Sequence, residues 1–400
     1  MTPAVNREAP PGRRSAGTLR AVILETAVVR RAPAALILGG AFRGDLPHSS
    51  REAAQNTNRG RSATARRTGD PSKMTTSPQA DVRALLAPIA EDMAAVDRII
   101  REELASDVRR MHEIGEYITS AGGKRMRPAL LIMMARALGY QGDLAPYLGA
   151  TIELLHTATL MHDDVVDESD MRRGRPTANA RWGNGVAVLV GDFLYTRSFQ
   201  MMIRAGNLKV MEALANAANR LSEGEVIQMA NAHDPSVDEE RYFQVIERKT
   251  ACLFEAAARM AAAIADADEK SVNALAEYCL ALGNAFQIAD DILDYQGVAA
   301  DIGKNLGGDL REGKMTLPLI YARELADEGD RAMIDEAVRK GDGDFDKISA
   351  VVLKSGALDR CRARAEKELE RGRAALSQIP SSIFSESLLN LLSFTVKRDR

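Results

Sequence analysis

Two identical carboxylate patterns could do chemistry in this sequence, and each follows an apolar segment with helical periodicity. The first is Asp163-Asp164-Val-Val-Asp167, and the second, Asp290-Asp291-Ile-Leu-Asp294, begins 127 residues later (290 minus 163). At 3.6 residues per turn, the first and last aspartates of each pattern share a helix face. Both patterns lie near expected helix C-termini, where the helix dipole and carboxylate repulsion each cost about 0.3 to 1 kcal/mol. A compensating cation is therefore expected.

Because the candidate ligands are all oxygens, they favour Mg²⁺ as this cation. Mg²⁺ typically binds one or two carboxylates and completes its shell with water and substrate phosphates. A solvated acidic face is the simpler interpretation of one such pattern. Two equal patterns on strongly apolar helices favour the metal site.

Basic residues lie beside both carboxylate patterns. In Gly122-Gly123-Lys124-Arg125-Met126-Arg127-Pro128, the proline suits the first turn of a helix, so Lys124 and Arg127 add charge to a helix N-terminus that can bind anions. Arg172 and Arg173 follow the first pattern, and Lys304 and Lys314 follow the second. Carboxylates that hold a metal and bases that hold phosphate together indicate a diphosphate-binding enzyme.

Helices must position these residues. From about Asp81 onward, helix-forming residues recur at three- and four-residue intervals, and runs of β-branched or aromatic residues are few. We therefore predict an all-α domain over residues 81–400. Its expected helices cover residues 82–106, 109–120, 127–139, 145–168, 184–205, 207–231, 238–265, 269–296 and 316–327, with shorter helices beyond. Breaks are expected at Gly122-Gly123, Arg172–Pro176 and Gly297–Lys314.

The composition excludes several classes of protein. With 400 residues and 46% hydrophobic residues, the chain can bury a large core. Its formal charge of −3 lacks the basic surplus of a nucleic-acid binder. Cys252, Cys279 and Cys361 are far apart, which argues against a disulfide framework and for a reducing cytoplasmic location.

The first 73 residues differ from the rest of the chain. They carry 13 Lys and Arg against 5 Asp and Glu, a charge of +8 that leaves −11 for the remainder. Their best apolar stretch, Ala21–Leu38, is interrupted by Arg30 and Arg31 and is too short for a membrane span. We predict a disordered extension over residues 1–80, with Met74 as the natural start; a targeting peptide is the alternative.

The ordered motifs from about residue 82 to residue 400 resemble those of trans-type polyprenyl diphosphate synthases of the long-chain octaprenyl, solanesyl or decaprenyl kind. The resemblance rests on the basic loop, both aspartate patterns, Arg172-Arg173-Gly, Val-Gly-Asp192-Phe-Leu, Lys249-Thr250, Phe286-Gln287 and Gly-Lys314-Met-Thr-Leu-Pro. It implies a single large helical bundle around a central cavity, as in isoprenoid synthases. It also implies sequential head-to-tail condensation of isopentenyl diphosphate onto an allylic diphosphate.

The resemblance also implies residue roles. Asp163, Asp167 and Asp290 would bind Mg²⁺ on the allylic diphosphate, with Asp164, Asp291 and Asp294 as further metal, water or supporting ligands. Arg172, Lys249 and Lys314 would bind the same diphosphate, and Lys304 lies in the same basic loop as Lys314. The isopentenyl diphosphate site would contain Lys124, Arg127, His156 and Arg173, with Thr250 and Gln287 nearer the reacting carbons.

Product length should depend on the space beside the helix that carries the first pattern. Ala158 and Thr159 lie four or five residues before Asp163, about 6 to 7.5 Å along the helix axis. Because both are small, a growing tail could pass them, and a long product is expected. Tight helix packing is the alternative role of Ala158. Phe199 and Met202 are candidates for a deeper floor of the tunnel.

Other residues have simpler interpretations. Glu153-x-x-His156 has the spacing of half a di-iron site, but no second such pair occurs. His162 and Trp182 are expected to pack or to form hydrogen bonds, and Cys252 and Cys279 to be buried small residues.

Two rival functions stay open. A terpene cyclase would use similar aspartates but needs no second diphosphate site. A non-catalytic subunit of a heteromeric synthase would keep the helices and lose acids, whereas both patterns are complete here. The resemblance implies a homodimer that makes the side chain of a respiratory quinone and delivers its product to the membrane, with no nucleic-acid partner.

Overall fold

The computed structural model describes residues 84–120, 123–296 and 307–397, all within one compact unit, Ser72–Arg400. The predicted extension over residues 1–80, Met74 and Lys304 lie outside the described residues.

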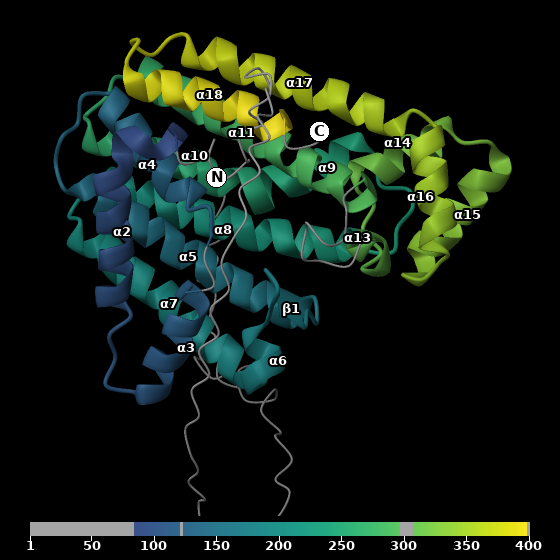
Figure 1. Cartoon of the computed structure of the whole chain (residues 1–400), viewed down its shortest axis with the longest axis horizontal. Coiled ribbons are helices and arrows are strands. Elements are labelled where there is room, and N and C mark those ends of the chain that lie inside the picture. Colours follow the sequence, from purple (N-terminus) through teal and green to yellow (C-terminus); the bar gives the residue numbers. More distant parts are fainter. Residues whose placement is uncertain (1–83, 121–122, 297–306, 398–400) are drawn as a thin grey trace, which may run out of the picture. The chain divides into compact units, whose positions relative to one another are not determined.

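Helices make up nearly all of the described chain, as predicted (Figure 1). The N-terminal half contains a 3₁₀ turn η1 (Ala87–Ile89), α2 (Ala90–Glu103), α3 (Arg109–Ser120), α4 (Met126–Ala137), α5 (Leu144–Val166), α6 (Ala178–Trp182), α7 (Asn184–Arg204) and α8 (Leu208–Asn231). The C-terminal half contains α9 (Glu239–Ile246), a π-helical turn η2 (Glu247–Ala251), α10 (Cys252–Ile264), α11 (Glu269–Gln296), α13 (Gly308–Arg311), α14 (Leu317–Leu325), α15 (Glu328–Lys340), α16 (Phe345–Lys354), α17 (Ala357–Leu376) and α18 (Ile383–Lys397).

The strands of the described residues form one short hairpin in the break predicted after the first aspartate pattern. In it, β1 (Met171–Arg172) pairs antiparallel with β2 (Arg175–Pro176). The turn residues Arg173 and Gly174 both have positive φ angles, 54° and 73°, which suits a two-residue hairpin turn. The short helix α6 was not predicted from the sequence. The helix predicted over 238–265 is continuous but contains the π turn.

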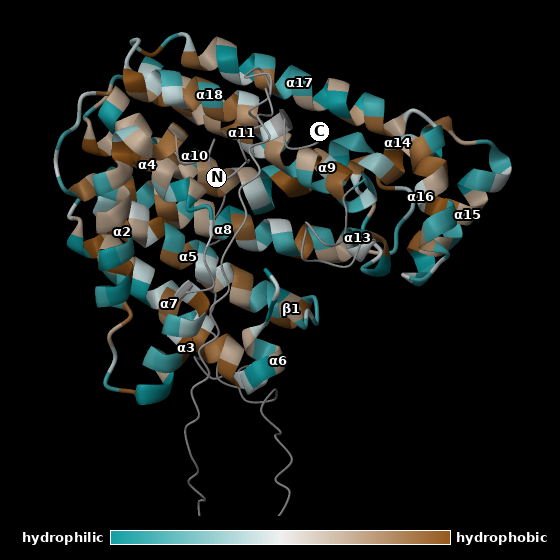
Figure 2. Cartoon of the chain, viewed as in Figure 1, coloured by the Kyte–Doolittle hydropathy of each residue, from teal (hydrophilic) through white to brown (hydrophobic). Residues whose placement is uncertain are grey.

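Two hydrophobic clusters hold the helices together. The larger cluster joins α2, α4, α5, α7, α8, α10 and α18 with the first half of α11. The smaller cluster joins α9 and α14–α17 with the second half of α11. Because α11 is 28 residues long, it crosses both clusters, and the second aspartate pattern lies in the part that packs in the smaller cluster. Figure 2 shows mostly hydrophobic residues along α4 and α10, and mixed stretches along α15 and α17.

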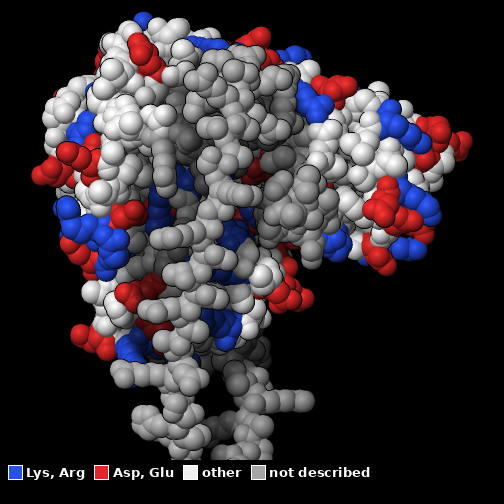
Figure 3. All heavy atoms as spheres, viewed as in Figure 1, with Lys and Arg blue, Asp and Glu red and all other residues white. Residues whose placement is uncertain are grey.

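The described surface is mixed in charge. Acidic and basic side chains are interspersed over α2 and α15 on the face shown in Figure 3. Among the described helices, none combines the length and the apolar character that a bilayer crossing requires.

Candidate active site

The first aspartate pattern occupies the C-terminal end of α5, as its sequence position predicts. The side chain of Asp163 is 17% exposed, and its carboxylate lies 3.9 Å from Lys249 Nζ. Lys249 Nζ donates to Glu225 on α8 at the shorter distance of 2.7 Å. Burial raises the pKa of Asp163 to about 7; Lys249 opposes this shift, and Glu225 and Asp167 add to it. The charge of the Asp163 carboxylate is therefore only partly compensated by the nearby cations of the protein.

The hairpin after α5 returns Arg172 to the same pattern. Arg172 donates to Asp164 Oδ1 from Nε at 2.8 Å and from Nη2 at 2.7 Å. Because Asp164 is buried and Arg172 is about one-third exposed, this ion pair fixes the guanidinium at the edge of the carboxylate cluster.

Lys314 lies beside the last aspartate of the pattern. Its Nζ is 3.6 Å from Asp167 Oδ1, and it also pairs with Glu312. Burial alone would lower the pKa of Lys314, but Glu312 and Asp167 raise it above the ordinary value, so the side chain is a cation. With its amide oxygen facing the cations, Gln228 accepts from Lys249 Nζ at 3.2 Å and from Lys314 Nζ at 3.3 Å.

The second pattern divides into aspartates with different surroundings. Asp290 is exposed, whereas Asp291 is 3% exposed. Asp291 accepts from the Tyr242 hydroxyl at 2.6 Å and from Gln287 Nε2 at 2.9 Å, so both of its oxygens are engaged. Burial, together with Asp309, raises the pKa of Asp291 well above its ordinary value. Asp294 accepts from two backbone N–H groups, at Gly307 and Asp309, and so holds the start of α13.

The π turn connects the two aspartate patterns. Lys249, which faces Asp163, is followed by Thr250, whose hydroxyl donates to Gln287 Oε1 at 2.9 Å. Gln287 precedes Asp290 by three residues on α11, a spacing that places both on neighbouring positions of one helix face. This chain of contacts brings together residues that are more than 100 positions apart in the sequence. π turns within α-helices are frequent at functional sites.

Two glycines leave room for the π turn. A Cβ atom at Gly224 of α8 would lie 2.8 Å from the Lys249 backbone nitrogen. A Cβ atom at Gly283 of α11 would lie 2.8 Å from the Ala251 Cα atom. Both distances are below normal contact, so the absence of side chains lets α8 and α11 enclose the wide turn that carries Lys249 and Thr250.

The basic loop before α4 forms a second cationic region. Arg125 takes a left-handed conformation at the start of α4 and binds Glu153 at 3.0 Å and Asp97 at 3.4 Å. Lys124 is exposed. Arg127 lies with its guanidinium 4.7 Å from the centre of the Phe254 ring, and its buried Nε has no hydrogen-bond partner within the described part of the chain. Burial lowers the pKa of Arg127, because the guanidinium charge is removed from water.

The second region also contains His156 and Arg173. A Cβ atom at Gly123 would lie 2.7 Å from Arg173 Nη1, so the glycine of the basic loop makes room for the hairpin arginine. A cavity of about 60 Å³ is lined by His156, Arg172, Arg173 and Glu153, among others. Burial and the surrounding arginines lower the pKa of His156 well below its ordinary value, so the imidazole is neutral at pH 7. A small cavity with a neutral hydrogen-bonding imidazole and guanidinium groups suits an anionic ligand.

Comparisons with known proteins agree with this arrangement. A family model described as polyprenyl synthetase matches residues 108–354. The chain belongs to the polyprenyl synthetase family. Octaprenyl diphosphate synthase of Escherichia coli (strain K12) is 47% identical over 313 residues, which are 78% of this chain and 97% of that protein. All-trans-nonaprenyl-diphosphate synthase (geranyl-diphosphate specific) of Rhodobacter capsulatus is 44% identical over 316 residues, 78% of this chain and 97% of that protein.

Solved structures of polyprenyl synthetases have the same fold as this chain. A decaprenyl diphosphate synthase from Rhodobacter capsulatus has a TM-score of 0.76 and 46% identity, and the match covers 80% of this chain and 99% of that one. A polyprenyl synthase from Caulobacter crescentus CB15, complexed with calcium and isoprenyl diphosphate, has a TM-score of 0.77 and 39% identity over 80% of this chain and 98% of that one. The predicted family and the all-α isoprenoid-synthase fold are confirmed, and the chain is a prenyltransferase.

Sequence reasoning about this polyprenyl synthetase missed Glu225, Gln228 and Tyr242. Glu225 and Gln228 are separated by three residues on α8, which places them on one face, and Gly224 directly precedes them. That spacing is a weak signal by itself. The role of Glu225 and Gln228 depends on how closely α8 approaches the π turn. That approach cannot be read from the residues near them in the sequence.

The candidate chain-length residues lie where α5 packs along α7. Ala158 and Met202 are buried in the larger cluster, and Phe199 packs against that cluster with its ring stacked on Tyr195 at 5.0 Å. Thr159 is partly buried and donates to the His156 carbonyl at 2.9 Å.

The residues with simpler interpretations are placed as follows. Glu153 pairs with Arg125. His162 Nε2 lies 3.3 Å from the Val188 carbonyl and from Asp192, and Trp182 packs edge-on against Tyr117. The three cysteines are free and buried.

Proposed function

We propose that this prenyltransferase joins isopentenyl diphosphate to an allylic diphosphate repeatedly and makes a long-chain polyprenyl diphosphate. The observation that carries the proposal is the presence of two sets of cations, which adjoin where Arg172 and Arg173 line the same cavity. Arg172, Lys249 and Lys314 lie on the first aspartate pattern, and Arg127, His156 and Arg173 form the other region. A terpene cyclase, the rival function, needs only one diphosphate site.

The first region is suited to a leaving diphosphate. When the allylic carbon–oxygen bond breaks, negative charge grows on the departing diphosphate. Cations held in place beforehand stabilise that charge more than they stabilise the substrate, which accelerates the reaction. Lys249 and Lys314 are held by Glu225, Glu312 and Gln228. Thr250 and Gln287 then lie nearer the reacting carbons, and the lost proton passes to the released diphosphate.

The residues present fit Mg²⁺. Asp163 has a raised pKa and incomplete neutralisation, Asp167 is partly exposed, and Asp290 is exposed, so these three carboxylates would hold the ions. Mg²⁺ would supply positive charge against the diphosphate oxygens. Since their oxygens are engaged within the protein, we assign Asp291 and Asp294 to positioning rather than to direct metal binding.

The second region would bind isopentenyl diphosphate. Arg127 offers a buried Nε without a partner in the described structure, and Arg173 and the neutral His156 face the small cavity beside it. Lys124, exposed at the start of the loop, would contact the outer phosphate. Lys304 lies outside the described residues, and its assignment to substrate binding rests on the sequence alone.

The relatives support a long product and a divalent cation. Those with the higher identities are named for octaprenyl, nonaprenyl and decaprenyl products, and one solved structure contains calcium and isoprenyl diphosphate. We propose further that the product is the side chain of a respiratory quinone and passes to the membrane, and that the enzyme is cytoplasmic.

A homodimer is part of the same proposal. Large apolar side chains are exposed on α7 and α8, namely Leu189 (62%), Ile203 (59%), Val226 (65%) and Met229 (62%). Exposed apolar side chains on these two helices suit contact with a second copy of the chain. Light scattering of the purified chain should give twice the monomer mass.

The proposed function has a direct test. The purified chain, incubated with farnesyl diphosphate, labelled isopentenyl diphosphate and Mg²⁺, should incorporate label into products much longer than the starter. Chelation with EDTA should stop incorporation, and added Mg²⁺ should restore it. Cyclised hydrocarbon without consumption of isopentenyl diphosphate would indicate a terpene cyclase. Inactivity of the chain alone, with activity only in mixture with another chain, would indicate a subunit of a heteromeric synthase.

Replacing Ala158 by phenylalanine should shorten the product. Ala158 is buried one turn before Asp163, so a phenyl ring there would block a tail that runs down α5. Chromatography of the product should show fewer isoprene units. The rate of the first condensation should stay within about threefold of the original, because neighbouring side chains can shift to accept the ring. An unchanged chain length would contradict the tunnel assignment and leave Ala158 as a packing residue.

A further inference from the structure

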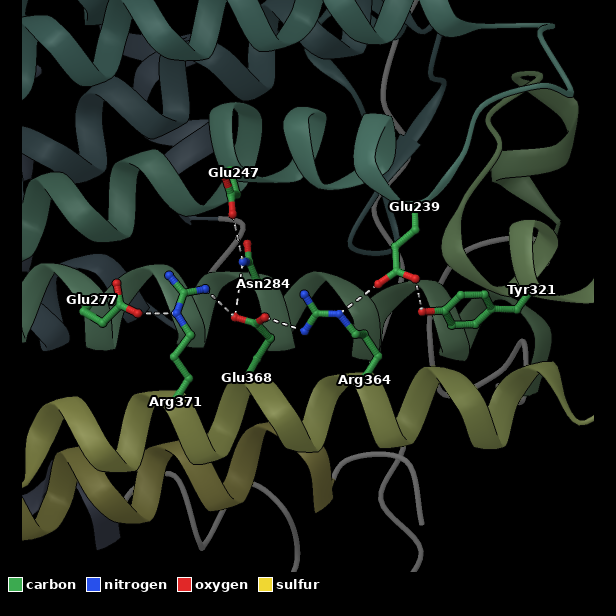
Figure 4. A network of polar contacts seen from close by, with 8 residues as sticks. All are labelled: Glu239, Glu247, Glu277, Asn284, Tyr321, Arg364, Glu368 and Arg371. Atoms are coloured by element: carbon green, nitrogen blue, oxygen red, sulfur yellow. Dashed lines mark hydrogen bonds and ion pairs between the residues drawn. The ribbon is translucent and has the colours of Figure 1, made fainter. Parts of the chain in front are cut away.

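A polar network runs along the buried side of α17 and reaches the π turn (Figure 4). At its centre is Glu368, which is 2% exposed. Its carboxylate accepts from Arg364, from Arg371 Nη1 at 3.0 Å and from Asn284 Nδ2 at 3.3 Å. The outer ends of the network are Glu277, which pairs with Arg371, and Glu239, which pairs with Arg364 and Tyr321.

Stability alone does not explain this network. A buried carboxylate loses hydration, and replacing a buried charge network by apolar residues of similar size is often neutral or stabilising. Asn284 is fully buried, and its Oδ1 atom has no hydrogen-bond partner in the described part of the chain, which destabilises the folded state. An amide placed at such a cost indicates a positional requirement.

Asn284 connects the network to the π turn. Its Nδ2 group donates to Glu368 on one side and faces Glu247 Oε1 at 3.5 Å on the other. Glu247 is the first residue of the π turn. Figure 4 shows the amide between the two carboxylates.

Three positions of α11 contact the same turn. Asn284 contacts its first residue, the Cβ-free surface of Gly283 contacts its last residue, Ala251, and Gln287 accepts from Thr250 between them. A π turn holds one residue more than an α turn. If it relaxed to α-helix, one side of the helix would rotate by about 100° relative to the other, and Lys249 and Thr250 could not both keep their directions.

We propose that Asn284, held by Glu368, is a positioning residue that keeps the π turn in the register required by Lys249 and Thr250. The proposal rests on the proposed function, because these two residues act there on the allylic substrate. It gives α17, which lies across α11 from the active site, a defined part in the reaction. Neither residue touches the substrate in this account.

The test combines Asn284→Ala with Thr250→Ala and with their double variant. We expect Asn284→Ala to lower kcat/KM for farnesyl diphosphate about tenfold, with KM for isopentenyl diphosphate within about twofold. If Asn284 acts through the turn, the activity of the double variant should match that of the less active single variant, within about twofold. Multiplicative losses would overturn the proposal, since they show that the two residues act independently.

A matched control and a second measurement complete the test. Glu277→Gln alters the outer end of the same network without touching Asn284 or Glu247, and it should leave kcat/KM within about twofold. Amide hydrogen exchange over residues 247–252 should be about tenfold faster in Asn284→Ala than in the control at 25 °C. Equal exchange in both would overturn the proposal.

The exchange measurement does not depend on activity. If the unaltered chain incorporates no isopentenyl diphosphate, the proposed function fails, while exchange still decides whether Asn284 holds the turn. If Asn284→Ala does not fold, Asn284→Ser replaces it, because serine keeps a short polar group at the same position.

Discussion

Asp163→Asn should lower kcat/KM for the allylic diphosphate about 10²- to 10³-fold, the size of effect that follows removal of one preorganised charge-stabilising group. The same substitution should make the ligand-free protein more stable at pH 8. The two effects have one cause, because the carboxylate that would bind the metal is largely removed from water and close to Glu225 and Asp167.

The pH dependence follows from the raised pKa. Asp163 has a pKa of about 7 in the folded protein and an ordinary value of 3.8 when unfolded. Its protonated form therefore favours folding below pH 3.8, and this contribution is lost as the pH rises through 7. At pH 8 the folded chain bears the full cost of a desolvated charge, and asparagine removes about 1 to 3 kcal/mol of it. The extra stability of the asparagine variant should therefore become smaller as the pH falls from 8 to 5.

Urea unfolding of the two proteins in EDTA at both pH values measures this effect. Asp192→Asn is a suitable control, because Asp192 is more than half exposed and contacts His162 rather than a metal-site residue. A variant that is less stable than the original chain at pH 8 would show that Asp163 is well compensated by Lys249, and the metal assignment would lose its main support.

Arg127→Gln should raise KM for isopentenyl diphosphate about 10- to 100-fold, the range expected for one or two lost charge-assisted hydrogen bonds. KM for farnesyl diphosphate should stay within about twofold. The selectivity arises because Arg127 lies with Phe254 in the second cationic region, whereas Lys249 and Lys314 serve the first.

Steady-state kinetics with one substrate varied at a time separates the two regions. Arg98→Gln provides a control, since Arg98 is exposed on α2 and pairs with Glu102 across one helical turn. Equal increases in both KM values would mean that Arg127 supports the fold rather than one substrate. No change in either would remove Arg127 from the isopentenyl diphosphate site.

Most of the helices could be predicted because their signals are local. The spacing of apolar residues along α5, α7, α8 and α11 places the ends of these helices within about two residues of the observed ends. The π turn could not be predicted, since residues 238–265 read as one uninterrupted helix. It exists where Gly224 and Gly283 allow α8 and α11 to approach, which is a property of three helices together.

The sequence by itself determined the family, the all-α fold and the closeness of Arg172 to the first aspartate pattern, because motifs, helix periodicity and short hairpins are read from nearby residues. The tertiary structure placed Lys314, which follows the second pattern in the sequence, beside Asp167 of the first. Only the tertiary structure decided which acids face the site. It buried Asp291 against Tyr242, left Asp290 exposed, and placed Glu225 on Lys249. Ion pairing and desolvation act over a few ångströms in space, and residues far apart along the chain become neighbours only when the helices pack.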